Sequence, residues 1–183
     1  MSKISLTPNA SGTGTLTIAA PNTSTDRILT LPDETGTVLS STSNITSQAM
    51  NGPTFRASGS GQSISGGVGN KITNATEVWD TASCYDTSTS RFTPNVAGYY
   101  QITVILVLPA LSSSSLLINY IYKNGSSYSY FYNTVLSGLT HSVTHTDIVY
   151  LNGSTDYVEQ YGLPGETKST TTSIITGSLI RAA

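Results

Sequence analysis

A run of apolar residues with no polar side constrains this chain more than any other feature. From Ile102 to Leu108 every residue except Thr103 is apolar, so neither the odd nor the even positions form a polar face. The preceding Phe92–Tyr100 segment, with its Thr-Pro and Gly-Tyr-Tyr sequences, predicts a corner that leads into this strand. A strand without a polar side must be covered on both faces. We expect a sandwich core to cover one face and a second subunit to cover the other.

The spacing of strand and turn signals indicates an all-β fold. No helical period of useful length occurs, and short alternating segments are separated by Gly, Pro and Asn turns. The predicted strands are Thr54–Ser58, Ile64 with Val68, Glu77–Tyr85, Arg91–Thr93, Tyr99–Leu108, Leu116–Lys123, Ser127–Thr134, His141–Leu151, Asp156–Tyr161 and Thr172–Ile180. They predict a jelly-roll β-sandwich head of about eight to ten strands over residues 52–183. The side chains expected in its core or at a subunit contact on the central strand are Tyr99, Tyr100, Ile102, Val104, Leu106 and Leu108.

The first 40 residues differ from the rest of the chain. They contain short strand-like segments with few apolar residues, namely Leu16, Ile18, Ile28, Leu29, Leu31, Val38 and Leu39. So little apolar material does not form an independent core. We therefore expect residues 1–40 to be an extended β arm that packs on a larger partner. The Ser- and Thr-rich residues 41–51 are interpreted as a linker.

Composition excludes several classes of partner. Only 10% of the residues are charged, the net charge is −2, and the basic residues are scattered singly. Phosphate binding needs a basic patch, so nucleic acid is not expected as a partner. No segment approaches the roughly 20 apolar residues of a membrane span, so membrane insertion is not expected either.

The start of the chain and its single cysteine indicate the compartment. Met1-Ser2-Lys3 is followed by Thr, Asn and Gly and does not resemble a signal peptide. Cys84 has no internal partner for a disulfide, and we expect a buried thiol. A protein made in the host cytoplasm with the composition of an exposed surface is typical of a virion component.

Five blocks in order carry a resemblance to a known family. They are Phe55 with Ala57, Tyr85-Asp86 followed by Phe92–Tyr100, Lys123-Asn124-Gly125, Leu151–Val158, and Thr176–Ile180. Together they resemble the globular head of complement component C1q, a trimeric jelly roll of the tumour necrosis factor (TNF) superfamily. The resemblance implies a homotrimer. Related heads can carry calcium near the trimer apex, but no dense acidic loop is present, so no cofactor is expected.

The arm carries a different resemblance. The segment from Leu16 to Leu39 resembles one that recurs in tailed-bacteriophage fibre and other virion proteins. This implies that residues 1–50 bind other virion proteins and anchor the chain to the particle. The chain has no collagen-like Gly-X-Y stalk, which favours the phage interpretation over a secreted one.

Tyrosines flank the predicted Lys-Asn-Gly turn at even positions: Tyr120, Tyr122, Tyr128, Tyr130 and Tyr132. A loop of odd length would pair Tyr122 with Tyr128 and Tyr120 with Tyr130, giving a ladder on one face, whereas a strict two-residue turn would divide the set between faces. Such a ladder either lines the trimer interface or forms a binding platform for a host-surface glycan or protein.

No catalytic pattern is present, and we expect no enzyme activity. His141, His145 and Asp147 share one face of a strand, but the two histidines lie roughly 13 Å apart at ~3.3 Å per residue. They are interpreted as ordinary strand residues; a metal site built from three chains on the trimer axis is the alternative.

Two roles compete for such a trimer. The first is a short fibre or spike whose head projects outward and binds the host surface. The second is a capsid decoration protein at three-fold positions, favoured by the absence of a long shaft. A bacterial adhesion module is a third interpretation, from another class.

Overall fold

The computed structural model describes residues 52–183 together with residues 11–14, 17, 22, 24–26 and 28. The chain divides into two compact units, residues 1–41 and 42–183. Ile28, predicted to contact the virion, is 92% exposed. The other predicted anchoring residues, Leu16, Ile18, Leu29, Leu31, Val38 and Leu39, lie outside the described residues.

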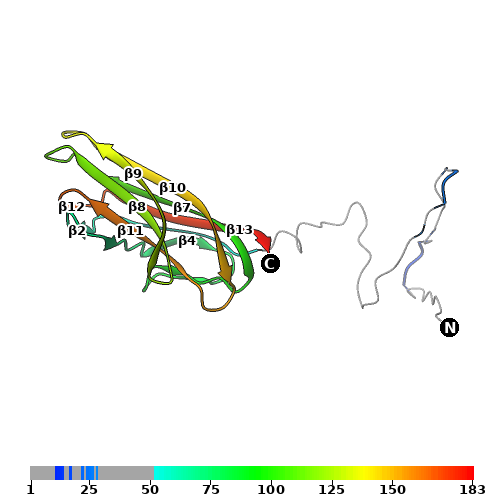
Figure 1. Ribbon diagram of the computed structural model, residues 1–183. Helices are drawn as coiled ribbons and strands as arrows, with labels where there is room; N and C mark the ends of the chain where they lie inside the picture. The colour runs from blue at the N-terminus through cyan, green and yellow to red at the C-terminus, as the bar shows by residue number, and fades with distance from the viewer. Residues whose placement is uncertain (1–10, 15–16, 18–21, 23, 27, 29–51) are drawn as a thin grey trace. The chain divides into compact units, whose positions relative to one another are not determined.

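Residues 52–183 form two antiparallel sheets packed face to face, and the described residues contain no helix (Figure 1). The strands are β1 (Thr54–Gly59), β2 (Ser63–Ile64), β3 (Asn70–Lys71), β4 (Thr76–Asp80), β5 (Tyr85–Asp86), β6 (Arg91–Phe92), β7 (Ala97–Leu108), β8 (Ser115–Lys123), β9 (Ser126–Val135), β10 (His141–Asn152), β11 (Val158–Pro164), β12 (Lys168–Ser169) and β13 (Thr172–Ala182). The first sheet has the order β10-β7-β13-β1-β4. The second has the order β5-β6-β11-β8-β9, with β3 also paired to β11, and β12 pairs with β2. The predicted all-β sandwich is confirmed.

The central strand β7 alternates sharply between two environments. Its even side chains are all fully buried in the core: Tyr100, Ile102, Val104, Leu106 and Leu108. Its odd side chains, among them Ile105 and Val107, point out of the sandwich. Tyr99 belongs to this outer set and is 47% exposed, so it is not a core residue like the others in its predicted group. The sandwich core therefore covers one side of the apolar run. The other side lies on the outer face of the first sheet.

The core consists of two apolar clusters. One surrounds the stacked rings of Phe55 and Phe92, whose centroids are 4.1 Å apart. The other contains Ile64, Ile72, Leu106, Leu108, Leu111, Leu117, Val135 and Val143. On β8, Asn119 lies between Leu117 of the second cluster and Ile121 of the first, and its side chain is fully buried. A buried polar layer thus separates the two clusters.

Gln160 on β11 is the hub of this layer. Its Nε2 donates to the Ile105 carbonyl oxygen at 3.0 Å and to Asn119 Oδ1 at 2.9 Å, and its Oε1 accepts a hydrogen bond from Asn74 Nδ2 at 3.0 Å. Ser173 Oγ on β13 donates to Asn74 Oδ1 at 2.7 Å. Buried polar groups are costly unless they are hydrogen-bonded. The network therefore joins the two sheets at a single relative register.

One predicted strand, Glu77–Tyr85, is broken in the structure. β4 ends at Asp80, whose carboxylate accepts hydrogen bonds from the backbone N–H groups of Ala82 (3.1 Å) and Tyr85 (2.6 Å). Ser83 has a positive φ of 53° in this turn, and β5 begins at Tyr85. The two-residue strands β3 and β12 were not predicted. Cys84 lies in the turn and is buried, as predicted, and burial raises the pKa of its thiol.

The polar layer predicts a large effect of Gln160→Ala on stability. The substitution leaves the buried amides of Asn74 and Asn119 without their partner, and each unsatisfied buried group costs about 1–3 kcal/mol. We expect the free energy of unfolding, measured by urea titration, to fall by about 3 kcal/mol or more. The matched control is Glu77→Ala, which truncates an exposed side chain of the same length on β4 and should change it by less than about 0.5 kcal/mol. Equal losses in the two variants would contradict the prediction.

Candidate functional site

The outer face of the first sheet carries few charges. Strand register aligns the following rows across β10, β7 and β13: Tyr150–Tyr99–Arg181, Ile148–Gln101–Ser178, Thr146–Thr103–Thr176, Thr144–Ile105–Ile174 and Ser142–Val107–Thr172. Arg181 stands at the end of the face, and the other four rows are uncharged, with mostly hydroxyl-bearing or β-branched side chains. Arg56 on the neighbouring strand β1 lies 5.8 Å from the ring centroid of Trp79 on β4. We call this surface the hydroxyl face.

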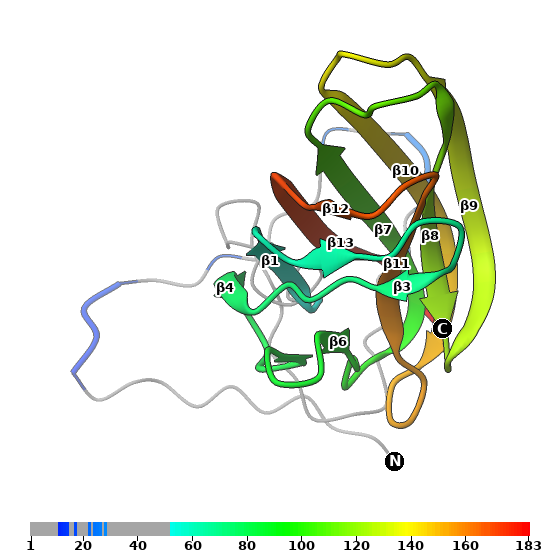
Figure 2. The same ribbon diagram turned by 90° about the vertical axis from the view of Figure 1, so that its left-hand side faces the viewer.

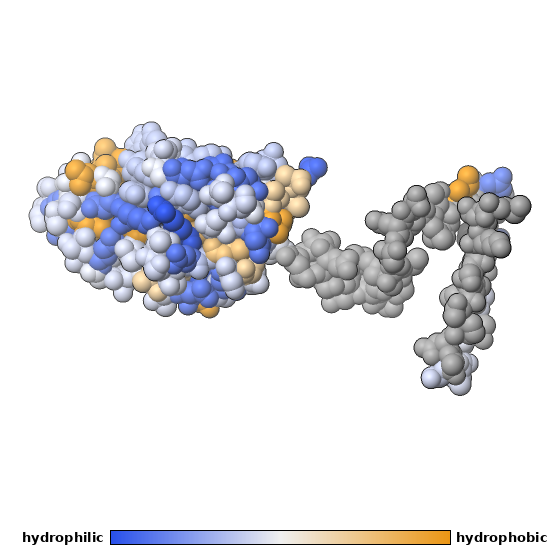
Figure 3. Space-filling view, turned by 90° about the horizontal axis from the view of Figure 1, so that it is seen from below, coloured by the Kyte–Doolittle hydropathy of each residue, from blue (hydrophilic) through white to orange (hydrophobic). Residues whose placement is uncertain are grey.

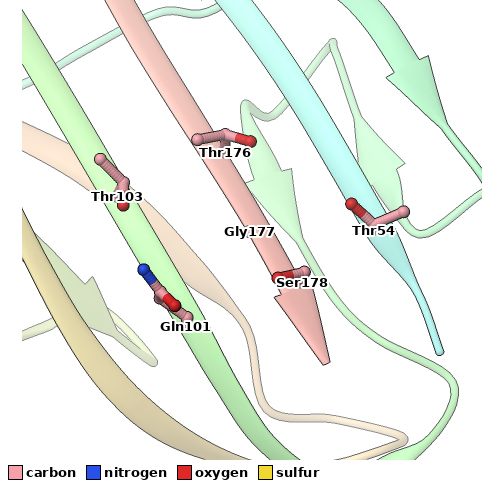
Figure 4. Close-up of a pocket in the computed structure, with 6 residues that line it drawn as sticks. All are labelled: Thr54, Gln101, Thr103, Thr176, Gly177 and Ser178. Carbon is pink, nitrogen blue, oxygen red and sulfur yellow. The ribbon is translucent and has the colours of Figure 1, made fainter. Parts of the chain in front are cut away.

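A shallow hollow of about 160 Å³ lies in the middle of the hydroxyl face. Figure 4 shows its lining, which comes from β1, β7 and β13: Thr54, Gln101, Thr103, Thr176, Gly177 and Ser178. The lining side chains are small or uncharged, and no titratable group is among them. The hollow can therefore accept a side chain from another molecule but offers no chemistry for a reaction.

The β9 and β10 strands form one edge of the sandwich, on the side away from β4 (Figure 2). The exposed apolar side chains at this edge are Tyr128, Phe131, Leu136, Leu139, Ile148 and Tyr150, whereas Tyr130 and Tyr132 on β9 turn to the outer face of the second sheet. Two hydrogen bonds join the sheets at this edge: Tyr128 donates its hydroxyl to the Ile148 carbonyl oxygen at 3.1 Å, and Ser129 Oγ lies 2.8 Å from His145 Nε2. We call this the β9/β10 edge.

Apolar residues are dispersed over the face of the head that Figure 3 shows. They form small separate patches among polar side chains rather than one continuous apolar surface. No helix among the described residues is long and apolar enough to cross a membrane.

The β8–β9 hairpin resolves the two alternatives for the tyrosine ladder. Its loop is the two-residue Asn124-Gly125 turn, with φ angles of 53° and 79°, as an Asn-Gly hairpin turn requires. A β-bulge next to the turn leaves Tyr128 as an extra residue, because Tyr122 pairs with Ser127. The predicted pair of Tyr122 with Tyr128 is wrong.

The bulge puts the tyrosines of both strands on the same face, whereas a two-residue turn alone would have divided them between two faces. Tyr120 lies opposite Tyr130, as predicted, and Ile118 lies opposite Tyr132. Tyr161 on β11 pairs with Tyr120 from the other side. The five residues Tyr120, Tyr122, Tyr130, Tyr132 and Tyr161 therefore share the outer face of the second sheet, and we call this surface the tyrosine face. Tyr161 was not predicted as a member of this face; the available signal was Tyr157, which lies four residues earlier and has the same parity.

The rings of the tyrosine face pack against one another. Tyr122 and Tyr161 are stacked with centroids 3.9 Å apart, and Tyr120 lies edge-on to Tyr122 at 5.7 Å. Tyr120 also contacts Tyr130 at 5.4 Å. Tyr130 and Tyr132 remain 55% and 57% exposed.

Charges beside the tyrosine face are paired. Glu159 on β11 is 1% exposed, and its Oε2 accepts hydrogen bonds from Lys71 Nζ and, at 3.1 Å, from Arg91 Nε. The Arg91 guanidinium lies 4.1 Å from the ring centroid of Tyr157. The two cations and one buried carboxylate leave one net positive charge in this cluster, and Glu159 holds both cations in place.

The predicted histidines hold structural positions. His141 Nε2 donates to the Leu136 carbonyl oxygen at 2.6 Å, and His145 contacts Ser129. Asp147 accepts a hydrogen bond from the backbone N–H of Ile148. Within residues 52–183 and the described part of the arm, no group of three or more His, Cys, Asp or Glu side chains could hold a metal ion.

Comparison with known proteins gives the fold but no sequence family. No family model and no curated protein sequence matches the chain. Among solved structures, the globular domain of zebrafish complement 1qA matches with a TM-score of 0.57 and 16% identity, over 72% of this chain and 99% of that one. Eiger TNF from S. frugiperda matches with a TM-score of 0.57 and 13% identity, over 74% and 96%. The head has the C1q/TNF-like jelly-roll fold.

A phage virion protein shares this fold. PRD1 vertex protein P5 matches with a TM-score of 0.54 and 19% identity, over 70% of this chain and 97% of that one. The jelly-roll part of the predicted resemblance is confirmed. No described residue bears on the resemblance of the arm beyond the isolated positions given above.

His145 predicts a loss of stability in acid. Burial lowers its pKa, and this outweighs the opposite effect of the Asp147 charge. The folded chain therefore binds this proton less tightly than the unfolded chain, whose histidines titrate near pH ~6.5. The contribution to stability is present above that pH and is lost as pH falls through the lower folded-state pKa.

Urea unfolding at several pH values between about 5 and about 8 measures this effect. His145→Gln should remove part of the acid-side loss. Ser129→Ala deletes the hydrogen-bond partner but keeps the titrating ring, so the loss should persist. An identical pH dependence in the His145→Gln variant and the natural chain would contradict the assignment.

Proposed function

We propose that this chain is a structural protein of a phage virion that forms a homotrimeric short fibre or spike. The arm, residues 1–50, anchors it to other virion proteins, and the head projects outward and binds the host surface. The fold shared with PRD1 vertex protein P5 supports a virion role, and the resemblance of Leu16 to Leu39 to phage fibre segments supports the role of the arm.

The observation that carries the trimer is the hydroxyl face. Its rows of uncharged side chains lie on the second side of the apolar β7 strand, the side to which Ile105 and Val107 point. Interface cores are depleted in charge, and this face combines low charge with a hollow that can receive a partner side chain.

The geometry of the sandwich favours a closed ring. A three-fold ring joins two different patches on each subunit, and the angle between them must allow the rotation to close. The hydroxyl face and the β9/β10 edge meet at β10, so a contact between them turns one subunit relative to the next. Phe131, Leu136 and Leu139 are exposed at this edge and do not belong to the tyrosine face, so they are available to enter the hollow of the neighbouring subunit.

Light scattering or native mass spectrometry tests the trimer. We expect the mass of three 19.2 kDa chains. Ser178→Arg places a charge in the hollow at an exposed position and should shift the protein toward monomer. Ser169→Arg makes the same kind of change on the exposed strand β12, outside the hydroxyl face and the β9/β10 edge, and should leave the trimer intact. A monomeric natural chain, or equal behaviour of the two variants, would refute the interface.

We expect the head to form a trimer without the arm but to need the arm for attachment to the particle. A chain beginning at Gly52 should keep the trimeric mass, because the described core lies within residues 52–183. It should be absent from purified particles, because residues 1–50 anchor the chain. Particle composition by mass spectrometry, with the full chain as control, measures this. Retention of the truncated chain on particles would contradict the anchoring role.

A capsid decoration protein is the second candidate, since a trimer with an uncharged interface also fits a three-fold position of a shell. Density for the chain in a particle reconstruction separates the two roles. Density at vertices or on the tail supports the spike, whereas density at three-fold positions of the shell supports decoration.

A further inference from the structure

We infer that the tyrosine face is a binding platform for a neutral carbohydrate chain. This inference rests on the proposed function, because it assigns the chemical class of the host-surface ligand. Its residues, Tyr120, Tyr122, Tyr130, Tyr132 and Tyr161, come from three neighbouring strands of the second sheet.

The platform is preorganised. Tyr122, stacked on Tyr161 and edge-on to Tyr120, cannot rotate freely, and Tyr120 in turn supports Tyr130. From β9 to β11 the face spans about 10 Å, and Tyr130 and Tyr132 lie about 7 Å apart along β9. Rigid rings lose little conformational freedom when a ligand binds. The area accommodates a short oligosaccharide rather than a single sugar.

The hydroxyl groups distinguish these tyrosines from the structural ones. Tyr85, Tyr100 and Tyr128 each donate the hydroxyl to a backbone carbonyl oxygen, of Asn74, Val96 and Ile148 respectively. The hydroxyls of the tyrosine face make no hydrogen bond to any other residue that the structure describes. Burial raises the pKa of Tyr120 and Tyr161, so these two hydroxyls stay protonated at neutral pH and can donate.

Sugar chemistry matches this combination. A pyranose ring has an apolar C–H face, which stacks on an aromatic ring, and an edge of hydroxyls, which need donors and acceptors. Tyrosine supplies both an apolar ring and a polar tip. An exposed sheet face that carries rings with free hydroxyls therefore matches both the apolar C–H faces and the hydroxyl edges of a hexose chain.

The pairing of the nearby cations with Glu159 favours a neutral ligand over an acidic one. Lys71 and Arg91 are the basic residues beside the platform, and both bind Glu159. An acidic sugar would have to share these cations with Glu159, whose negative charge opposes a second carboxylate at the same place, and the five tyrosines offer it no positive charge.

A second copy of the chain does not fit this face in a closed trimer. The hydroxyl face and the tyrosine face lie on the outer sides of the two packed sheets (Figure 1). A contact that joins opposite sides of a sandwich stacks subunits into an open row, whereas a ring needs patches at an angle. The tyrosine face therefore stays free when the hydroxyl face and the β9/β10 edge form the trimer.

The test is a printed array of defined oligosaccharides probed with the full-length trimer. The array carries neutral hexose oligomers, sialylated and uronic-acid oligomers, and unglycosylated protein spots. The neutral oligomer with the strongest signal is then titrated in solution by calorimetry, which gives a Kd per site independent of valency. We expect Tyr130→Ala and Tyr132→Ala each to weaken this Kd about tenfold. Tyr130→Phe and Tyr132→Phe keep the ring and should weaken it less.

The matched control is Trp79→Ala, which removes an exposed aromatic ring from β4, at the edge of the first sheet opposite β10, and should leave the per-site Kd unchanged. Thermal melting and native mass of each variant check folding and assembly. Three array results would overturn the inference: no binding to neutral oligomers, binding to acidic oligomers only, or equal binding to unglycosylated protein spots. An unchanged Kd in both Tyr130→Ala and Tyr132→Ala would also overturn it. Loss of the trimer in these variants would make the face a subunit contact and also overturn it. The proposed function is tested separately, by the trimeric mass of the natural chain and by its place on the particle. None of the outcomes above changes these two measurements.

Discussion

The hydrogen bonds of Gln160 are the constraint on which the rest of the head depends. A buried amide can stay in the core only if its donors and acceptors are matched, and the partners of Gln160 come from both sheets and from the loop that holds Asn74. A slip of one residue would turn this side chain to the opposite face of the sheet and leave its partners unsatisfied. The polar layer thereby fixes how the sheets sit on each other, while the apolar clusters on either side supply most of the burial.

Once this register is fixed, the two outer faces of the sandwich become chemically different. The first sheet turns threonines, serines and β-branched residues outward, together with a hollow at its centre. The second sheet turns rings outward, with hydroxyls that the fold does not use. The first surface suits a contact with another copy of the chain, and the second suits a ligand that brings its own hydroxyl groups. The proposed trimer and the proposed carbohydrate platform therefore use opposite faces and do not compete.

Sequence patterns predicted the long elements well and the short irregular ones poorly. Alternation and turn residues located β7, β8, β9 and β10 to within two residues, because these strands are long and bounded by Gly, Pro or Asn. They failed at Asp80, where a side chain that accepts two backbone hydrogen bonds ends a strand without any Gly or Pro. They also failed at Tyr128, since a bulge depends on how two strands pair rather than on the residues of one strand.

The sequence alone determined the class of the fold, the two-sided apolar strand and the even spacing of the tyrosines, since all three follow from local periodicity. The tertiary structure decided which side of each strand faces the core, and it separated Tyr99 from Tyr100. It also brought Tyr161 next to Tyr122 and placed the buried Glu159 between two basic residues. These relations join segments that are distant in the chain. They depend on strand pairing and on the Gln160 network, which no local pattern encodes.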